Sequence, residues 1–379
     1  MAPPTNKKLY TNGRPHFPRL LIVAVLLLFS VAHCTRGVPP PDAGPLPAEP
    51  ARDFDRLFQR TGDGWTGGDG TLSVKLPDGR SVWLFGDTLL GSVFPDRTRP
   101  TDAPFIRNSL VVQNGAALET RFQSHSGIPG AFFTSPSDRE WFWPGDGTVE
   151  DHHLRIFLHR FEQQAPRLWA WRWAGTHLAT LALPTLTWID TRPAPSDNEV
   201  LYGGCILETE HYTYVYGTQD RIFPKQAHLA RTPAGRLQGP WHYFDGREWT
   251  DRSQGSAAIL EGVSTQYSVI QARDRFYLFT MDGRTPFSNE IVVYRSGRPT
   301  GPWQGPQVVY RAPDTGPQVA AYNPFVHVQF AENGRVLVSY NLNHISDPAA
   351  LYRDADIYRP RFIRVDLAEV DRRFDQMRP

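Results

Sequence analysis

The sequence is poor in cysteine and lysine. Only 2 of its 379 residues are Cys, and only Cys205 lies within the region expected to fold. No disulfide is therefore expected there, and stability must come from a hydrophobic core. Lysine supplies only 4 of the 40 basic residues, and the net charge is +1. This balance leaves no surplus of positive charge for a nucleic-acid-binding face.

The chain also lacks the motifs of the common cofactor and metal sites. It contains no Cys-rich zinc pattern, Walker loop, dinucleotide-binding fingerprint, EF-hand loop or Gly-x-Ser-x-Gly elbow. His152, His153 and His159 are not spaced as metal ligands, and we interpret them as residues on a strand face. The sequence therefore predicts neither a metal nor a cofactor.

Residues 1–34 are typical of a signal peptide. Basic residues precede an apolar run over residues 20–31, which is shorter than the about 20 residues that cross a bilayer. Three alternatives stay open for this segment. They are cleavage near Ala32, lipidation of Cys34, which follows an imperfect lipobox, and an uncleaved membrane anchor. We expect an exported protein (periplasmic, cell-surface or extracellular) that meets a membrane only through a lipid on Cys34.

The remainder divides into a linker and one domain. Residues 35–52 are rich in proline, which fixes φ and lacks an N–H donor, so they are predicted to form a stiff linker. Residues 53–379 are predicted to form a single domain that ends in a short, exposed helix over residues 366–377.

A repeated strand pattern dominates this domain. Helical periodicity is nearly absent, and short aromatic and β-branched runs alternate with Gly, Pro, Asp and Asn. The aromatic-rich runs are residues 81–87, 153–159, 212–218, 275–281 and 335–341. Each follows a turn-marked strand, namely residues 68–72, 145–149, 203–207, 266–270 and 322–328.

Five such units predict an all-β fold, a five-bladed β-propeller with the turn-marked segments innermost. The last strand-like run, residues 361–367, is expected to complete the ring, with N-terminal residues as an option for the same blade. A β-sandwich or a jelly roll with accidental repeats is the alternative.

Three carboxylates are the main candidates for chemistry, because the inner strands of a propeller converge on one funnel. Asp69 and Asp146 each lie between two glycines, which leaves the backbone around the carboxylate open. Asp87 ends the first aromatic strand, 18 residues after Asp69. We expect Asp69 and Asp87 to lie side by side, although Gly-Asp-Gly is also ordinary turn chemistry.

Further residues near the predicted inner strands are candidates for binding a ligand. Trp65 and Trp143 offer aromatic faces on which a ligand is able to stack, although packing between blades would also explain these tryptophans. Side chains that are able to bind hydroxyl groups are Arg107, Asn108, Gln266, Tyr267, Asn323 and His327.

Residues 64–91, with the motifs WTGGDG (65–70) and FGDT (85–88), resemble the opening of a group of exported bacterial domains long labelled as of unknown function. Further matching motifs are WPGDG (143–147), YVYGT (214–218), HLAR (228–231) and GPW (239–241), so the resemblance covers most of residues 53–367. One branch of this group is the endo-D-arabinanases of actinobacteria. The group is five-bladed and similar in architecture to furanosidase propellers that attack arabinan and xylan.

The resemblance implies an exported glycoside hydrolase that acts on a furanose-containing polysaccharide such as arabinan, and it implicates Asp69 and Asp87. Glycoside hydrolysis generally needs two carboxyl groups, one to protonate the leaving oxygen and one to activate water or attack the sugar. We assign Asp69 as the base and Asp87 as the acid, with Asp146 orienting its neighbour or raising its pKa.

Some alternatives stay open. In the related furanosidase propellers the acid is a Glu of the third blade, which makes Glu208 and Glu210 alternatives to Asp87 as the acid. These related enzymes invert the configuration at the anomeric carbon, and we expect the same here. A monomer is expected, with a polysaccharide or oligosaccharide as its partner. The alternative function is a noncatalytic propeller that binds carbohydrate or organises an envelope complex, for which aromatic and amide side chains suffice.

Overall fold

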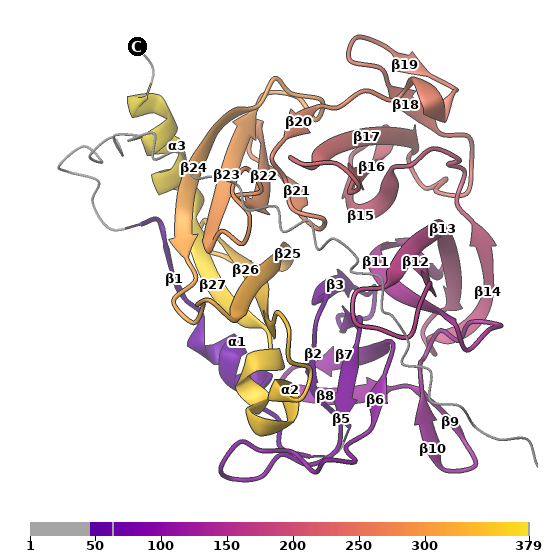
Figure 1. Ribbon diagram of the computed structural model, residues 1–379. Coiled ribbons are helices and arrows are strands. Elements are labelled where there is room, and N and C mark those ends of the chain that lie inside the picture. The colour runs from indigo at the N-terminus through magenta and orange to yellow at the C-terminus, as the bar shows by residue number, and fades with distance from the viewer. Residues whose placement is uncertain (1–45, 63, 378–379) are drawn as a thin grey trace, which may run out of the picture. The chain divides into compact units, whose positions relative to one another are not determined.

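Antiparallel β-sheets make up most of the computed structural model, which describes residues 46–62 and 64–377 (Figure 1). The first sheet contains β3 (Leu72–Lys75), β4 (Ser81–Phe85), β7 (Ser109–Asn114) and β8 (Ala117–Arg121). The second contains β11 (Glu140–Glu150), β12 (His153–Gln163), β13 (Trp171–Ala182) and β14 (Thr187–Pro193). The third contains β15 (Leu201–Glu208), β16 (Tyr212–Gln219), β17 (Gln226–Pro233), β18 (His242–Phe244) and β19 (Trp249–Thr250), with β20 (Leu260–Glu261) also paired to β17.

The fourth sheet contains β21 (Ser268–Ala272), β22 (Arg275–Met281), β23 (Glu290–Ser296) and β24 (Gln304–Arg311). The fifth contains β25 (Val319–Glu332), β26 (Arg335–His344), β27 (Arg361–Asp366) and β1 (Ala48–Pro50). Two small sheets are formed by β2 (Trp65–Gly68), β5 (Thr88–Leu90) and β6 (Phe105–Ile106), and by β9 (Gln123–His125) and β10 (Ile128–Gly130). The helices are α1 (Arg52–Leu57), α2 (Ala350–Arg353) and α3 (Leu367–Gln376), with 3₁₀ turns η1 (Ser253–Gly255) and η2 (Ala355–Tyr358).

The predominance of antiparallel β-structure is therefore confirmed. The second strands, β4, β12, β16, β22 and β26, coincide with the five aromatic-rich segments predicted from the repeat. The first strands contact one another in the order β3, β11, β15, β21 and β25, and β25 in turn contacts β3. Figure 1 shows the sheets following one another in the order of the chain.

Bulges interrupt the first strands of three sheets at matching positions. The register with the second strand shifts between Pro144 and Gly147 in β11, between Tyr202 and Cys205 in β15, and between Tyr322 and Phe325 in β25. A bulge inserts residues without partners and turns the side chains beside it. The turn-marked segments of the sequence are thus places where the first strands re-aim their side chains.

The predicted linker is wrong at its C-terminal end. Residues 48–50 pair with β27, and α1 begins at Arg52. Pro50 is compatible with this strand because β1 lies at the sheet edge, where a missing donor is tolerated. The pairing confirms that the last strand shares its sheet with N-terminal residues. Cys34 and the predicted signal peptide lie outside the described residues.

The terminal helix is confirmed as α3, but it is not simply exposed. Asp366 caps it by accepting hydrogen bonds from the N–H groups of Ala368 and Glu369. Val370 and Phe374 are buried against the fourth and fifth sheets. In the part of the chain that the structure describes, no helix has the length and apolar character needed to cross a membrane.

Candidate active site

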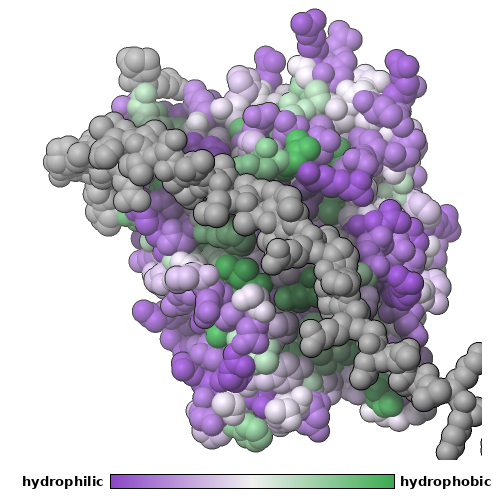
Figure 2. Space-filling view, in the orientation of Figure 1, coloured by the Kyte–Doolittle hydropathy of each residue, from purple (hydrophilic) through white to green (hydrophobic). Residues whose placement is uncertain are grey.

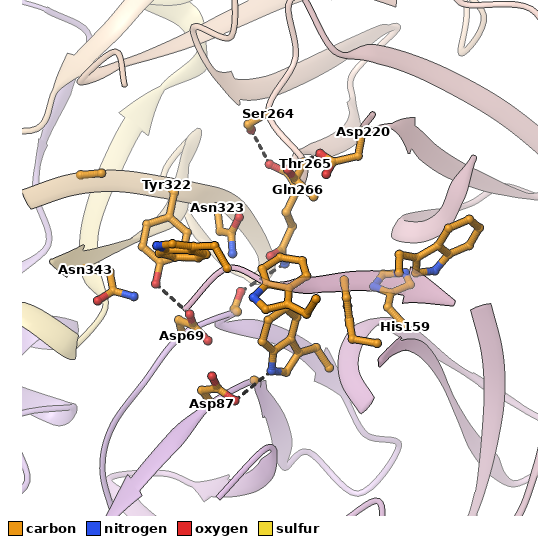
Figure 3. A pocket seen from close by; sticks show the side chains of 18 of the residues that line it. Asp69, Asp87, His159, Asp220, Ser264, Thr265, Gln266, Tyr322, Asn323 and Asn343 are labelled. Atoms are coloured by element: carbon orange, nitrogen blue, oxygen red, sulfur yellow. Dashed lines mark hydrogen bonds between the residues drawn. The ribbon is translucent and has the colours of Figure 1, made fainter. Parts of the chain in front are cut away.

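A cavity of about 1020 Å³ is lined by residues from all five large sheets and their loops. Figure 2 shows apolar side chains gathered in the recessed middle of one face, among hydrophilic surroundings. Six of the residues predicted for the site line the cavity, namely Asp69, Asp87, Trp143, Arg107, Gln266 and Asn323. Figure 3 shows Asp69 and Asp87 next to each other, with Gln266 and Asn323 facing the same space.

The backbone holds the two aspartates together. Asp69 follows β2 and Asp87 follows β4, and the N–H of Asp69 donates to the carbonyl of Asp87 at 3.3 Å. The N–H of Gly86 donates to the carbonyl of Asp69 at 2.8 Å. A Cβ on Gly86 would lie 2.8 Å from Oδ1 of Asp69, so a larger residue at this position would force the carboxyl group of Asp69 to shift. The expectation of neighbouring carboxylates is confirmed.

The two carboxyl groups have different partners. Asp87 lies 3.3 Å from Nη1 of Arg107 and accepts a hydrogen bond from Nε1 of Trp143 at 2.9 Å. Asp69 accepts a hydrogen bond from the hydroxyl of Tyr322 at 2.7 Å, and the hydroxyl of Tyr358 also bonds to it. A cation therefore accompanies Asp87 directly, whereas the side chains bonded to Asp69 are neutral.

Burial perturbs both carboxyl groups. It raises the pKa of Asp69 to about 7, and the negative charge of Asp87 adds to this effect while the two tyrosine hydroxyls oppose it. Burial also raises the pKa of Asp87, against the stabilising effects of Arg107 and Trp143. Two carboxyl groups that influence each other in this way tend to share one proton near neutral pH.

The other carboxylates lining the cavity are paired within their own surroundings. Glu199 bonds to Arg221 at 2.7 Å, and Asp220 pairs with Lys225. Asp282 forms two hydrogen bonds with Arg284, at 2.7 and 2.8 Å. Asp69 and Asp87 differ from these three carboxylates because they are neighbouring carboxyl groups with raised pKa values, which makes them the pair suited to acid–base chemistry.

Asp146 does not reach the cavity, contrary to the prediction. The bulge after Pro144 turns its carboxylate towards β15, where it accepts hydrogen bonds from the N–H groups of Gly147 and Ile206 at 2.8 and 2.7 Å. Burial raises its pKa to about 7. Asp146 therefore joins β11 to β15 and is not among the residues that line the cavity.

Trp65 and His327 are also wrongly assigned to substrate binding. Trp65 is fully buried, with its ring 5.4 Å from that of Phe58 and 4.8 Å from that of Phe85. The ring of His327 is enclosed between the hydroxyl groups of Ser73 and Ser339, at 2.6 and 2.9 Å, and burial lowers its pKa to about 3. Both side chains support the sheets.

Asn108 and Tyr267 have structural roles as well. The amide of Asn108 donates to the carbonyls of Phe133 and Phe142 at 3.0 and 2.9 Å, which fixes a loop against β11. The buried hydroxyl of Tyr267 donates to the carbonyl of Gly217 at 2.8 Å. Glu208 and Glu210 are exposed at the far end of β15, outside the cavity, and Glu208 bonds to Thr148.

Three side chains close to the site are not predicted from the sequence. Tyr322 directly precedes Asn323, and the turn-marked segment could have identified it. His159, which we had interpreted as a strand-face residue, lines the cavity and donates from Nε2 to the carbonyl of Tyr202, while burial lowers its pKa to about 4. Tyr358 comes from η2, a segment without any repeat signal.

Within residues 46–62 and 64–377, no group of three or more His, Cys, Asp and Glu side chains could hold a metal ion. The single cysteine in this part of the chain, Cys205, is buried and accepts a hydrogen bond from the N–H of Val269 at 3.2 Å.

Comparison with known proteins identifies a family. The model of the family described as "Domain of unknown function (DUF5005)" matches residues 51–368. No curated protein matches the sequence. The structure is similar to that of a proposed hydrolase from Bacteroides ovatus ATCC 8483, with 23% sequence identity and a TM-score of 0.76 over 88% of this chain and 93% of that one. This likeness shows a shared fold.

Glycoside hydrolases are found at lower similarity. A GH43_1 enzyme from Xanthomonas citri, complexed with xylotriose, matches with 13% identity and a TM-score of 0.49 over 82% of this chain and 92% of that one. A GH43 endo-arabinanase from Bacillus licheniformis matches with 12% identity and a TM-score of 0.42 over 80% and 94%. Both scores lie below 0.5, and nothing about the chemistry of this chain follows from them.

Proposed function

The chain belongs to the DUF5005 family, and we propose that it is an exported glycoside hydrolase that cleaves a furanose-containing polysaccharide such as arabinan. One observation carries this proposal: Asp69 and Asp87 lie side by side in a large cavity, and the pKa of Asp69 is raised to about 7. A carboxylic acid and a carboxylate at one place are what hydrolysis of a glycosidic bond requires.

A five-bladed propeller is the architecture we propose for the domain. The support is the series of first strands, each in contact with the next, which returns from β25 to β3. Each large sheet begins with such a strand, followed by one of the predicted aromatic strands. In a propeller this arrangement brings loops of all the blades to one funnel, which agrees with a cavity lined from all five sheets.

We assign Asp69 as the general acid and Asp87 as the base or nucleophile, which reverses the roles assigned from the sequence. Arg107 and Trp143 both stabilise a negative charge on Asp87. Asp69 is bonded to neutral side chains and is exposed to the charge of Asp87, so the proton held by the pair resides on Asp69. Asp69 then protonates the leaving oxygen, while Asp87 activates water or attacks the sugar.

Two kinds of observation support the proposed substrate class. A cavity of about 1020 Å³ lies at the upper end of the usual range of about 300–1,000 Å³ for small-molecule sites, and aromatic residues are prominent in its wall. Arabinan in particular rests on the resemblance of residues 64–91 to the endo-D-arabinanase group. Export rests on the basic and apolar segments of residues 1–34.

The proposal is tested by incubating the domain with arabinans, arabinogalactan and xylans and measuring new reducing ends. Asp69→Asn and Asp87→Asn should each lower turnover by at least about 100-fold on the best substrate, with little change in Tm. Wild-type rates in both variants would contradict the proposal. Binding of a polysaccharide without any cleavage would instead favour the noncatalytic alternative.

An aryl glycoside with a good leaving group separates the two roles, because its cleavage needs no general acid. On this substrate Asp69→Asn should keep much of its activity, whereas Asp87→Asn should lose it. The opposite pattern would restore the assignment made from the sequence.

A further inference from the structure

The tip of the β12–β13 hairpin, residues 164–170, connects two sheets across the cavity. The indole N–H of Trp169 donates to the carbonyl of Ile345 at 3.2 Å, and both residues line the cavity. Ile345 directly follows β26, in the fifth sheet, whereas the hairpin belongs to the second. The first sheet lies between the second and the fifth, because its strand β3 contacts both β11 and β25. The hydrogen bond between Trp169 and Ile345 therefore forms on the side of the cavity where Asp69 and Asp87 lie.

Trp169 is held at the rim in a conformation that a bulky residue rarely adopts. Its φ is +63°, in the left-handed region, and 58% of the residue is exposed. The amide of Gln163 fixes the hairpin tip by donating to the carbonyls of Ala165 and Ala170 at 2.6 and 3.0 Å. Such a conformation persists only where the surroundings determine it, which the bonds of Gln163 and Ile345 do here.

An aromatic ladder, formed by Trp169, Trp171 and Trp143, runs from this rim to the reacting carboxylates. The ring centroids of Trp169 and Trp171 are 6.2 Å apart, and those of Trp171 and Trp143 are 5.2 Å apart at an interplanar angle of 88°. Trp143 then donates to Asp87 at 2.9 Å. The ladder therefore gives one wall of the cavity a continuous aromatic lining, from Trp143 beside Asp87 to the exposed Trp169.

We propose that Trp169 is a binding platform for a sugar residue distant from the bond that is cleaved. This inference rests on the proposed function and deepens it, because it names a polymer chain, and not a short glycoside, as the occupant of the ladder. An exposed indole face suits the apolar face of a sugar ring, while its N–H is already engaged by Ile345. Energy from such remote contacts positions the bond to be cleaved.

The test is affinity electrophoresis in gels that contain debranched arabinan, arabinogalactan or xylan. At least one of these polymers should retard the wild type, and Trp169→Ala should weaken that binding about tenfold, as expected for the loss of one aromatic contact. Trp169→Phe keeps an aromatic face without the N–H donor and should bind within about twofold of the wild type. Phe94→Ala is the matched control, since Phe94 is 48% exposed but lies outside the cavity, and it should bind normally.

Three results would overturn the proposal: wild-type binding by Trp169→Ala, equal losses in Trp169→Phe and Trp169→Ala, or no retardation of the wild type by any of the three polymers. Equal losses would mean that the bond to Ile345 is what matters. The proposed function can fail separately. If a polymer retards the wild type through Trp169 but is never cleaved, the platform stands and the hydrolase does not.

Discussion

Replacing Arg107 by glutamine tests the proposed electrostatics of the site most directly. Arg107 places Nη1 3.3 Å from both carboxylate oxygens of Asp87, and its guanidinium lies 4.3 Å from the ring centre of Trp141. Arg107→Gln removes the positive charge that favours an ionised Asp87 but keeps a polar side chain. Protonation of Asp87 then becomes easier, and the fraction of active enzyme at low pH should fall.

The size of the effect follows from the geometry. A hydrogen bond to a charged group contributes about 1.5–3 kcal/mol, and the Arg107 side chain is 41% exposed, so solvent screening favours the lower end. A loss of about 1.4 kcal/mol corresponds to about tenfold in an equilibrium. We therefore expect kcat/KM of Arg107→Gln to be about tenfold below wild type on the acidic limb of the pH profile, and much closer to wild type on the alkaline limb.

The assay is kcat/KM against pH on the best polysaccharide, with Arg107→Lys as the control. Lysine keeps the charge and should restore most of the acidic limb, although it lacks the planar fork of arginine. A uniform loss at every pH would show that Arg107 serves only to bind substrate. An unchanged acidic limb would refute the assignment of Asp87 as the ionised partner.

Three further predictions concern other parts of the molecule. In the wild type, kcat/KM should fall as the pH rises through about 7, because the raised pKa of Asp69 marks the loss of the acid's proton; activity that stays constant to pH 9 would contradict this role. Asp146→Asn should lower Tm and leave kcat nearly unchanged, because asparagine offers only one acceptor oxygen to the two N–H groups of Gly147 and Ile206, while the cavity keeps its lining. Because the pKa of Asp146 in the folded state is about 7, the wild type loses stability as the pH rises through this value and Asp146 ionises. The difference in Tm between the wild type and Asp146→Asn should therefore become smaller from pH 5 to pH 8. A constant difference would show that Asp146 does not titrate in this range. Intact-mass measurement on protein from the native host should show loss of residues 1–32 or 1–33, with a diacylglyceryl adduct if Cys34 is lipidated, and a mass that retains residue 1 would contradict cleavage.

Local sequence patterns predicted the strands and the central carboxylates well. The aromatic runs are a property of strands buried on both faces, so β4, β12, β16, β22 and β26 were visible as a repeat. The glycines on both sides of Asp69 predicted an open backbone around its carboxylate, and in the structure the N–H of Gly86 donates to the carbonyl of Asp69 at 2.8 Å. These features depend on neighbours in sequence or on a single hairpin.

The errors arise where distant segments decide the direction of a side chain. Asp146 has the same Gly-Asp-Gly setting as Asp69, but the bulge after Pro144 turns it towards β15. Trp65 is enclosed because α1 brings Phe58 onto it, and that helix starts within the predicted linker. Trp169 lies in a connection without periodicity, so no sequence pattern marked its bond to Ile345, 176 residues away.

The pairing of β1 with β27 has a consequence for the order of synthesis. Ala48 pairs with Val365, and the N–H of Ala51 donates to the carbonyl of Phe362 at 2.8 Å. Contacts between such distant parts of a chain slow folding, because the intervening loop must be ordered first. The first of the described strands, β1, therefore has no partner until the last of them, β27, has been translated. A nascent chain that stops before Arg361 leaves the fifth sheet without its two outer strands. The domain remains open at that edge throughout its synthesis.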